Sequence, residues 1–172
     1  MVKKSEISRD LHKLNRLYLS ALLSPDPYLP MYYSKLAVLE LCGWIEDCMD
    51  DIIGRYVKRK KLRLISNTNY VKDSIIDRTH GFNYEGNFKR MLISTIGIVL
   101  TDKLELKINS PVLTRLKSNL EYLKGIRDPH AHSYLGSVMI LPTIAAPSVM
   151  LKRLDEVCED LHTLERKLKY IN

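Results

Sequence analysis

Apolar side chains recur at steps of three and four residues along most of this chain. That spacing places them on one face of an α-helix, whereas the alternation expected of a half-buried strand is scarce. We expect helices over residues 5–23, 31–61, 67–78, 85–100 and 110–124, and a last helix from about Pro147. The pattern therefore predicts an all-α fold, an up-and-down bundle of five to six helices.

Prolines and a glycine set the expected ends of several helices. Three prolines within residues 25–30 exclude continuation of the first helix. Ser110 suits a helix cap and Pro111 the first helical position, while Gly125 suits a stop. The β-branched residues within 96–99 would also fit a short strand, but the length of their segment favours a helix.

Two helices carry long apolar stripes that should form much of the core. In the central helix the stripe consists of Val38, Cys42, Ile45, Met49, Ile52 and Tyr56. In the last helix, apolar residues alternate in steps of four and three, at Met150, Leu154, Val157, Leu161, Leu164, Leu168 and Ile171. We expect this heptad seam to pack within the bundle rather than to form a free-standing coiled coil.

Length, charge and cysteine usage narrow the class of protein. A chain of 172 residues suits a single domain over residues 1–172. Lys and Arg number 27 against 20 Asp and Glu, and the net charge of +7 is compatible with a polyanionic partner. Three cysteines without a CxxC spacing fit a reducing cytoplasm. Because no signal peptide or membrane span is indicated, we expect a soluble cytoplasmic protein without membrane contact.

A basic run, Lys58-Arg59-Lys60-Lys61, closes the expected central helix. Cations in a last helical turn complement the negative end of the helix dipole, which would be a structural role on a solvated surface. The alternative is contact with RNA or another phosphate-bearing partner.

The sequence lacks the usual cofactor and metal motifs. It contains neither a Gly-rich phosphate loop nor HExxH, so no cofactor is predicted. His130 and His132 are close in sequence, but two imidazoles without a third ligand make a poor metal site. The acidic group within residues 46–51 could bind a hard cation, yet carboxylates at these helical spacings usually form a solvated face. No metal site is predicted.

The most specific chemistry lies in the segment Arg127-Asp128-Pro129-His130-Ala131-His132. Arginine can hold a phosphate through a forked hydrogen bond, and histidine can move protons near neutral pH. Because proline is tolerated in a first helical turn, we expect Asp128 to cap a helix, with Pro129 at its first position and His132 at its fourth. The positive end of that helix would favour an anion close to Arg127 and His132.

A structural role is the alternative for the same residues. Arg127 would pair with an acidic residue such as Glu46, and His132 would fill a half-buried position beside the last helix. An Arg and a His five residues apart arise often by chance, so the spacing alone favours this structural role.

Two segments resemble HEPN domains, in particular the branch known as RiboL-PSP-HEPN. Residues 127–132 are similar to the Arg-polar-x-x-x-His signature of these domains, which follows a helix and a glycine here. Residues 35–46 are similar to the branch's first core helix, whose apolar run ends with a glutamate at the place of Glu46. The resemblance extends over about residues 11–171, with a less specific middle segment.

This resemblance implies a fold, an activity and a set of residues. The family is an all-α bundle, commonly dimeric, and its active members are metal-independent endoribonucleases, often toxins of toxin–antitoxin or phage-defence systems. Arg127 and His132 would be catalytic, with Asp128 as the polar residue after the arginine and Glu46 as the acidic partner. The basic run and His130, which the family pattern does not fix, are the expected nucleic-acid contacts.

We therefore expect cleavage of RNA by attack of a 2′-hydroxyl on the adjacent phosphate. One Arg127–His132 pair offers a single histidine for two proton transfers, so a symmetric homodimer that brings two pairs together is chemically attractive. An antitoxin or another regulatory protein would be a further partner. The alternatives are a non-catalytic HEPN-like module that binds a protein or a nucleotide, and, on charge balance alone, binding to double-stranded DNA.

Overall fold

A computed structural model of the protein describes residues 3–131 and 144–171. All regular structure within these residues is helical, and no strand occurs in them, which confirms the predicted all-α bundle. The elements are α1 (Lys4–Ala21), α2 (Leu29–Lys60), α3 (Ile65–Tyr70), the π-helical segments η1 (Val71–Ile76) and η2 (Tyr84–Phe88), α4 (Lys89–Ile96), α5 (Ile98–Lys107), α6 (Ser110–Ala131) and α7 (Pro147–Lys169).

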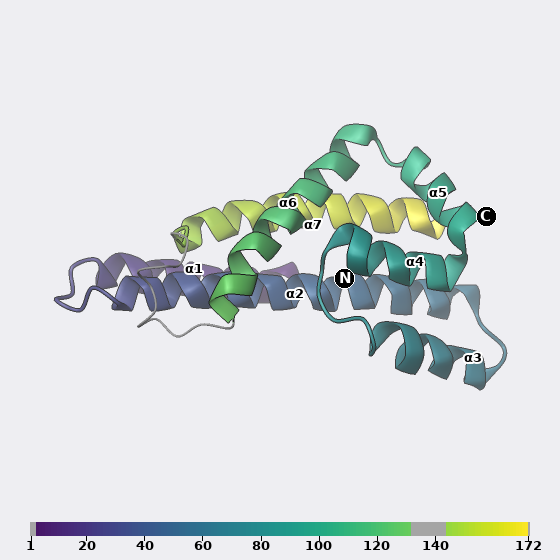
Figure 1. Ribbon diagram of the computed structural model, residues 1–172, viewed down its shortest axis with the longest axis horizontal. Coiled ribbons are helices and arrows are strands. Elements are labelled where there is room, and N and C mark those ends of the chain that lie inside the picture. Colours follow the sequence, from purple (N-terminus) through teal and green to yellow (C-terminus); the bar gives the residue numbers. More distant parts are fainter. Residues whose placement is uncertain (1–2, 132–143, 172) are drawn as a thin grey trace.

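Helix α2 is the long axis of the bundle, and the other long helices pack on it (Figure 1). Helix α1 contacts both α2 and α7, and α6 crosses obliquely over α2 and α7. The predicted apolar stripe of α2 is buried over its whole length, from Val38 to Tyr56. The predicted seam of α7 is buried too, from Met150 to Ile171, so it packs within the protomer as expected.

Gly97 breaks the helix that was expected over residues 85–100. Its φ of 84° lies in the left-handed region, which a residue without Cβ adopts at little cost, and α4 ends there. Helix α5 then begins at Ile98 and was not predicted. Its side chains carry no continuous apolar face, since Ile98 and Val99 are exposed while Leu104 is buried, so periodicity gave no signal for it.

The helix expected over residues 67–78 is present as α3 continued by η1. A turn follows, in which Gly81 has a φ of 105°. The Asn87 side chain secures this turn: its Nδ2 donates to the carbonyl of His80 at 2.8 Å, and its Oδ1 accepts from the N–H of Asn83 at 3.2 Å. The turn is therefore held against the first turn of the next helical segment.

Helix α6 begins where the sequence predicts, at Ser110, but its cap differs by one residue. The first backbone hydrogen bonds run from Val112 and Leu113 to the carbonyl of Asn109, at 2.9 and 3.2 Å. Asn109 is therefore the capping residue, and Pro111 lies at the second helical position, where a missing N–H still costs no intrahelical bond.

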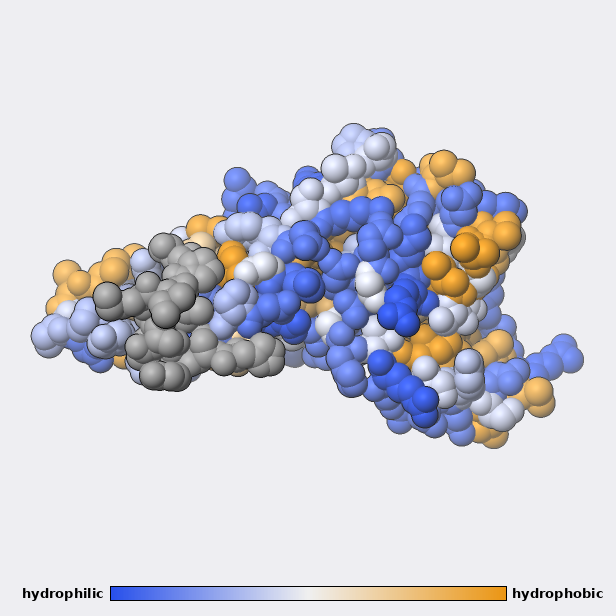
Figure 2. Space-filling model, viewed as in Figure 1, coloured by the Kyte–Doolittle hydropathy of each residue, from blue (hydrophilic) through white to orange (hydrophobic). Residues whose placement is uncertain are grey.

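The surface alternates between polar and apolar regions. Figure 2 shows a mostly hydrophilic middle and apolar side chains toward both ends of the long axis. Large exposed apolar residues include Leu19, Leu22, Leu23, Tyr28 and Tyr32 near the α1–α2 connection, Leu64 and Ile65 after α2, and Ile98, Val99 and Leu106 on α5. None of the helices in residues 3–131 and 144–171 has both the length and the apolar character needed to cross a bilayer.

Candidate functional site

Helix α6 runs through most of the predicted motif and ends at Ala131. The predictions of a stop at Gly125 and of a new helix capped by Asp128 are therefore wrong. Pro129 is tolerated because it lies in the last turn, where its missing N–H removes only the bond to the carbonyl of Gly125. The following proline disfavours a helical conformation for Asp128. Nζ of Lys124, one turn earlier on α6, lies 3.5 Å from Oδ2 of Asp128 and helps to hold it there.

This correction reverses the expected electrostatics of the helix end. Arg127 and Asp128 lie at the C-terminal end of α6, where the helix dipole is negative and favours cations. The dipole thus stabilises the Arg127 guanidinium but offers nothing to a phosphate. Recognition of an anion at this end of α6 therefore gains nothing from the helix dipole.

Arg127 gathers partners from three segments of the chain. Its Nη1 donates to Oε1 of Glu46 on α2 at 2.9 Å, and its Nε donates to Oδ1 of Asp128 at 2.9 Å. Its guanidinium also lies over the ring of Phe82, 5.1 Å from the ring centre. The structure therefore brings together Glu46, Arg127 and Asp128 among the predicted site residues, and 28% of the Arg127 side chain stays exposed.

Phe82 is a member of this site that sequence reasoning missed. It is buried in the turn before η2, and that turn is tied to α6 because Nδ2 of Asn83 donates to Oε2 of Glu121 at 2.6 Å. The Asn83 side chain also accepts from the N–H of Gly86 at 2.9 Å and so caps η2. The only sequence signal was a turn-forming stretch, which says nothing about the arginine packed on it.

Cys42 lies one turn before Glu46 on α2, and its pKa is affected by burial and by the charge of Arg127. Burial raises the pKa of its thiol to about 12, while the nearby Arg127 charge acts in the opposite direction. A thiol with so high a pKa stays protonated at neutral pH and is a poor nucleophile. Cys42 is therefore a packed core residue beside the arginine, as its place in the apolar stripe predicts.

The face of α2 beyond Glu46 is acidic. Burial raises the pKa of Asp50 to about 6, and the neighbouring carboxylates Asp47, Glu46, Asp77 and Asp51 act in the same direction. Burial is the larger cause of the shift, and repulsion among these carboxylates adds to it. A phosphate that approaches Arg127 would meet this negative field on one side.

Of the two histidines of the motif, the structure describes only His130. His132 lies outside the described residues, directly after the last residue of α6. His130 is only 1% exposed, so its side chain is packed inside the protomer. That burial removes His130 from the surface that a nucleic acid could reach.

The basic run forms the last turn of α2 and the residue after it, as predicted. All four side chains are exposed, Arg59 lies 3.8 Å from Glu165, and Lys60 donates to the carbonyl of Ile171 at 3.3 Å. At a helical rise of about 1.5 Å per residue, Lys58 lies roughly 18 Å along α2 from Glu46. The structure therefore does not bring the basic run to Arg127.

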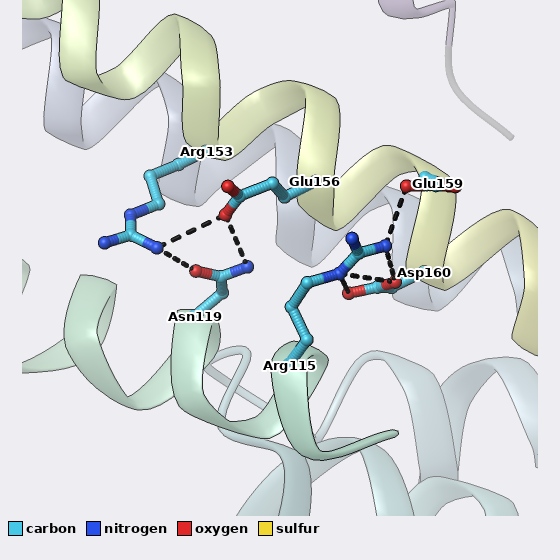
Figure 3. Close-up of polar contacts among 6 residues, drawn as sticks. All are labelled: Arg115, Asn119, Arg153, Glu156, Glu159 and Asp160. Carbon is cyan, nitrogen blue, oxygen red and sulfur yellow. Dashed lines mark hydrogen bonds and ion pairs between the residues drawn. The ribbon is translucent and has the colours of Figure 1, made fainter. Parts of the chain in front are cut away.

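A polar network fixes α6 on α7 (Figure 3). Arg115 donates from Nε and Nη2 to the fully buried carboxylate of Asp160, at 2.6 to 3.2 Å. One turn further along α6, Asn119 donates to Glu156 at 3.1 Å and accepts from Arg153. These contacts set the position of α6 and so the placement of Arg127 at its end.

The residues that suggested a HEPN domain are the motif at the end of α6 and the glutamate that contacts it from α2. Glu46 and Arg127 do meet, but an ion pair of this kind would also serve a purely structural role. Family membership therefore remains a prediction from the residues, since the chain matches no protein-family model, no curated protein and no solved structure.

Proposed function

We propose that this protein is a metal-independent endoribonuclease of the HEPN type, in which Arg127 and His132 carry out the chemistry. The observation that carries the proposal is the meeting of Arg127 with Glu46, the two residues that the resemblance pairs although 81 positions separate them. Arg127 is held from two sides and is still partly exposed, which suits a group that must contact a substrate phosphate.

The proposed reaction is a transesterification within the RNA strand. The 2′-oxygen forms a bond to the adjacent phosphorus, the bond from phosphorus to the 5′-oxygen breaks, and the products are a 2′,3′-cyclic phosphate and a 5′-hydroxyl. His132 would take the proton of the 2′-hydroxyl or return a proton to the leaving oxygen. Arg127 would stabilise the negative charge that accumulates on the phosphoryl oxygens.

Arg127 retains enough N–H donors to bind a substrate phosphate. A guanidinium has five N–H groups. Two of them donate to Glu46 and Asp128, and the other three make no hydrogen bond within the described part of the chain. Glu46 would act as a positioning residue, because it orients the guanidinium without touching the substrate.

The proposal includes a homodimer and, as the usual setting of such enzymes, an antitoxin or another regulatory partner. One histidine per chain has to serve two proton transfers, so two motifs that share one cleft would supply the general base and the general acid. A role as a toxin or a phage-defence effector would follow from ribonuclease activity.

The first test is RNA cleavage by purified protein in EDTA. We expect R127A and H132A to lower the rate by about 10²-fold or more at unchanged circular dichroism, and the product to carry a 2′,3′-cyclic phosphate. R166A and H162A, which replace exposed residues of α7, are the matched controls and should cleave like the wild type. Equal rates for all five proteins would exclude the proposed catalytic pair.

The role of Glu46 needs a graded series. E46A should lower kcat by about 10²-fold by freeing the guanidinium, whereas E46Q, which keeps an acceptor oxygen, should retain much of the rate. KM should change little in either variant, because Glu46 does not contact the substrate. A loss of the same size in both variants would show that Glu46 does not act by holding the guanidinium in place.

A second candidate function is a non-catalytic binding module, and the carboxylates around Arg127 favour it. Glu46, Asp128 and the acidic face around Asp50 oppose the approach of a phosphodiester. In that case, titration with RNA or with a nucleotide gives saturable binding or none, and no product forms on prolonged incubation.

A further inference from the structure

A pocket of about 410 Å³ lies outside the Glu46–Arg127 site, between the end of η1 and the start of α4. Its polar lining includes Ser74, Arg78, His80, Asn87, Arg90 and Ser94. We call it the arginine pocket. Its volume falls within the range of about 300–1,000 Å³ that is usual for small-ligand sites.

The charges of the arginine pocket are of one sign. Two guanidiniums and one imidazole line it, and no carboxylate of the described residues does. Figure 2 shows strongly hydrophilic side chains on both sides of the region between α4 and the α3–η1 segment. Cations that share one pocket without an anion repel each other, so a bound anion would stabilise the arrangement.

The two arginines also differ from most others in the molecule. Arginines that pair with a carboxylate at 3.8 Å or less are Arg9, Arg55, Arg59, Arg115, Arg127 and Arg153. Neither Arg78 nor Arg90 has such a partner within residues 3–131 and 144–171, and both side chains are exposed. Their forked donors are thus available to a ligand.

The backbone around the pocket is unusual and well fixed. Both π-helical segments of the described chain border it, through Ser74 on η1 and Asn87 on η2, and such segments often occur at functional sites. The Asn87 side chain bonds to the His80 carbonyl at 2.8 Å, and the Thr79 hydroxyl donates to the carbonyl of Ile75 at 2.7 Å. The Asn87 bond therefore ties the two sides of the pocket together before any ligand binds, while the Thr79 bond secures the turn after η1.

We propose that the arginine pocket binds the phosphate group of a small phosphorylated ligand. Guanidinium groups match phosphate oxygens through two parallel hydrogen bonds, and hydroxyl and amide groups complete such sites. Arg78 and Arg90 would hold the phosphate, and His80, Asn87, Ser74 and Ser94 would be further donors. This site does not depend on the proposed ribonuclease activity.

The test is calorimetric titration with three probes at low ionic strength: pyrophosphate, adenosine 5′-monophosphate, and a short RNA without terminal phosphates. We expect R78Q/R90Q to weaken binding of the first two probes at least tenfold. The control is R63Q/R166Q, which removes the same charge from two exposed arginines outside the pocket and should bind within twofold of the wild type. Equal affinities for the two double variants would overturn the proposal, and a loss confined to the RNA probe would replace the small ligand by a nucleic-acid strand.

A second measurement uses the unmodified protein and does not depend on the folding of any variant. The imidazole proton resonances of His80 should shift during a pyrophosphate titration, whereas those of His12 on α1 and His162 on α7, both exposed, should not. A titration that leaves His80 unmoved, or that moves all three histidines alike, would overturn the location of the site.

Discussion

At the scale of single residues, the partners of Arg127 are weak enough to be exchanged. Its bonds to Glu46 and Asp128 join side chains that are 28–40% exposed, and ion pairs of that exposure contribute only about 0–1 kcal/mol each. A phosphate could therefore displace the Asp128 carboxylate at small cost, while Glu46 keeps its bond to the guanidinium. The ring of Phe82 would keep the guanidinium in position during that exchange.

Asp50 should make the stability of the protein depend on pH. Its folded pKa, about 6, lies above the ordinary 3.8, so the folded state binds its proton more tightly than the unfolded state. The stabilisation is present at low pH and is lost as the pH rises from about 4 to 6. D50N should therefore be more stable than the wild type near neutral pH, by about 1 kcal/mol once partial exposure is allowed for.

Urea unfolding followed by circular dichroism between about pH 4 and pH 8 measures this effect. D102N removes an exposed carboxylate of α5 and is the matched control, which should follow the wild-type curve. The explanation fails if D50N shows the same pH profile as the wild type.

Gly81 and Gly54 should respond to alanine in opposite directions. Gly81 has a φ of 105°, and a Cβ there would lie 3.3 Å from Oδ1 of Asn87, so G81A should destabilise the fold by about 1–3 kcal/mol. Gly54 lies inside α2 with nothing within 4 Å of an added Cβ, so G54A should stabilise by about 0.5–1 kcal/mol. Thermal unfolding of both variants is the measurement, and a shift of the same sign in both would contradict it.

At the scale of elements, the sequence predicts helices well where one face is continuously buried. The stripes of α2 and α7 are examples, because every residue that defines them is in the core. Helix α5 was not predicted because only a few of its residues, among them Thr101 and Leu104, are buried against the rest of the protein. The end of α6 was mispredicted because Gly125 and Pro129, read as a stop and a start, are both accommodated within one helix once tertiary contacts hold it.

The candidate site, too, could be predicted from the sequence only in part. The pairing of Glu46 with Arg127 could be anticipated because each residue stood in a patterned segment. Phe82 and the arginine pocket could not, since they depend on how the turn near Gly81 folds back on α4 and α6. Nothing in the spacing of Arg78 and Arg90 shows that both face one pocket.

The docking of α6 on α7 should depend strongly on Arg115. Its removal leaves the Asp160 carboxylate buried without its cation, and the loss of one partner of a buried pair is costly. Because 41% of the Arg115 side chain is exposed, we expect R115M to cost about 2 kcal/mol rather than the full value for a buried pair. Chemical denaturation measures the cost, and R9Q, which breaks an exposed pair on α1, should change stability by less than about 0.5 kcal/mol.

The cost of R115M should also rise with pH. Burial raises the pKa of Asp160 above its ordinary value, and Arg115 acts in the opposite direction. Without the arginine the folded state would hold the Asp160 proton more tightly still, so the variant is least destabilised at acidic pH and loses stability as the pH rises. A penalty that is independent of pH would show that Asp160 is not the group left uncompensated.

At the scale of the whole molecule, the proposed chemistry requires more than one chain. Each protomer contributes one Arg127 and one His132, and the proposed cleft combines two such pairs across a two-fold axis. Two apolar regions, near the α1–α2 connection and on α5, give the protomer surface that a second copy could cover (Figure 2). Light scattering should then report about twice the protomer mass of 19.9 kDa.

A shared cleft can be distinguished from two independent sites by mixing inactive variants. R127A keeps His132 and H132A keeps Arg127, so a mixed dimer contains one intact residue of each kind, in different chains. If the cleft is shared, these residues face the same phosphate, and the mixture should regain part of the cleavage that each variant lacks alone, with the one remaining histidine serving both proton transfers. A mixture of R127A with the double variant R127A/H132A lacks any Arg127 and should stay inactive. If the first mixture also stays inactive while native mass spectrometry shows that mixed dimers form, an Arg127 and a His132 from different chains do not form a working site, which argues against a shared cleft.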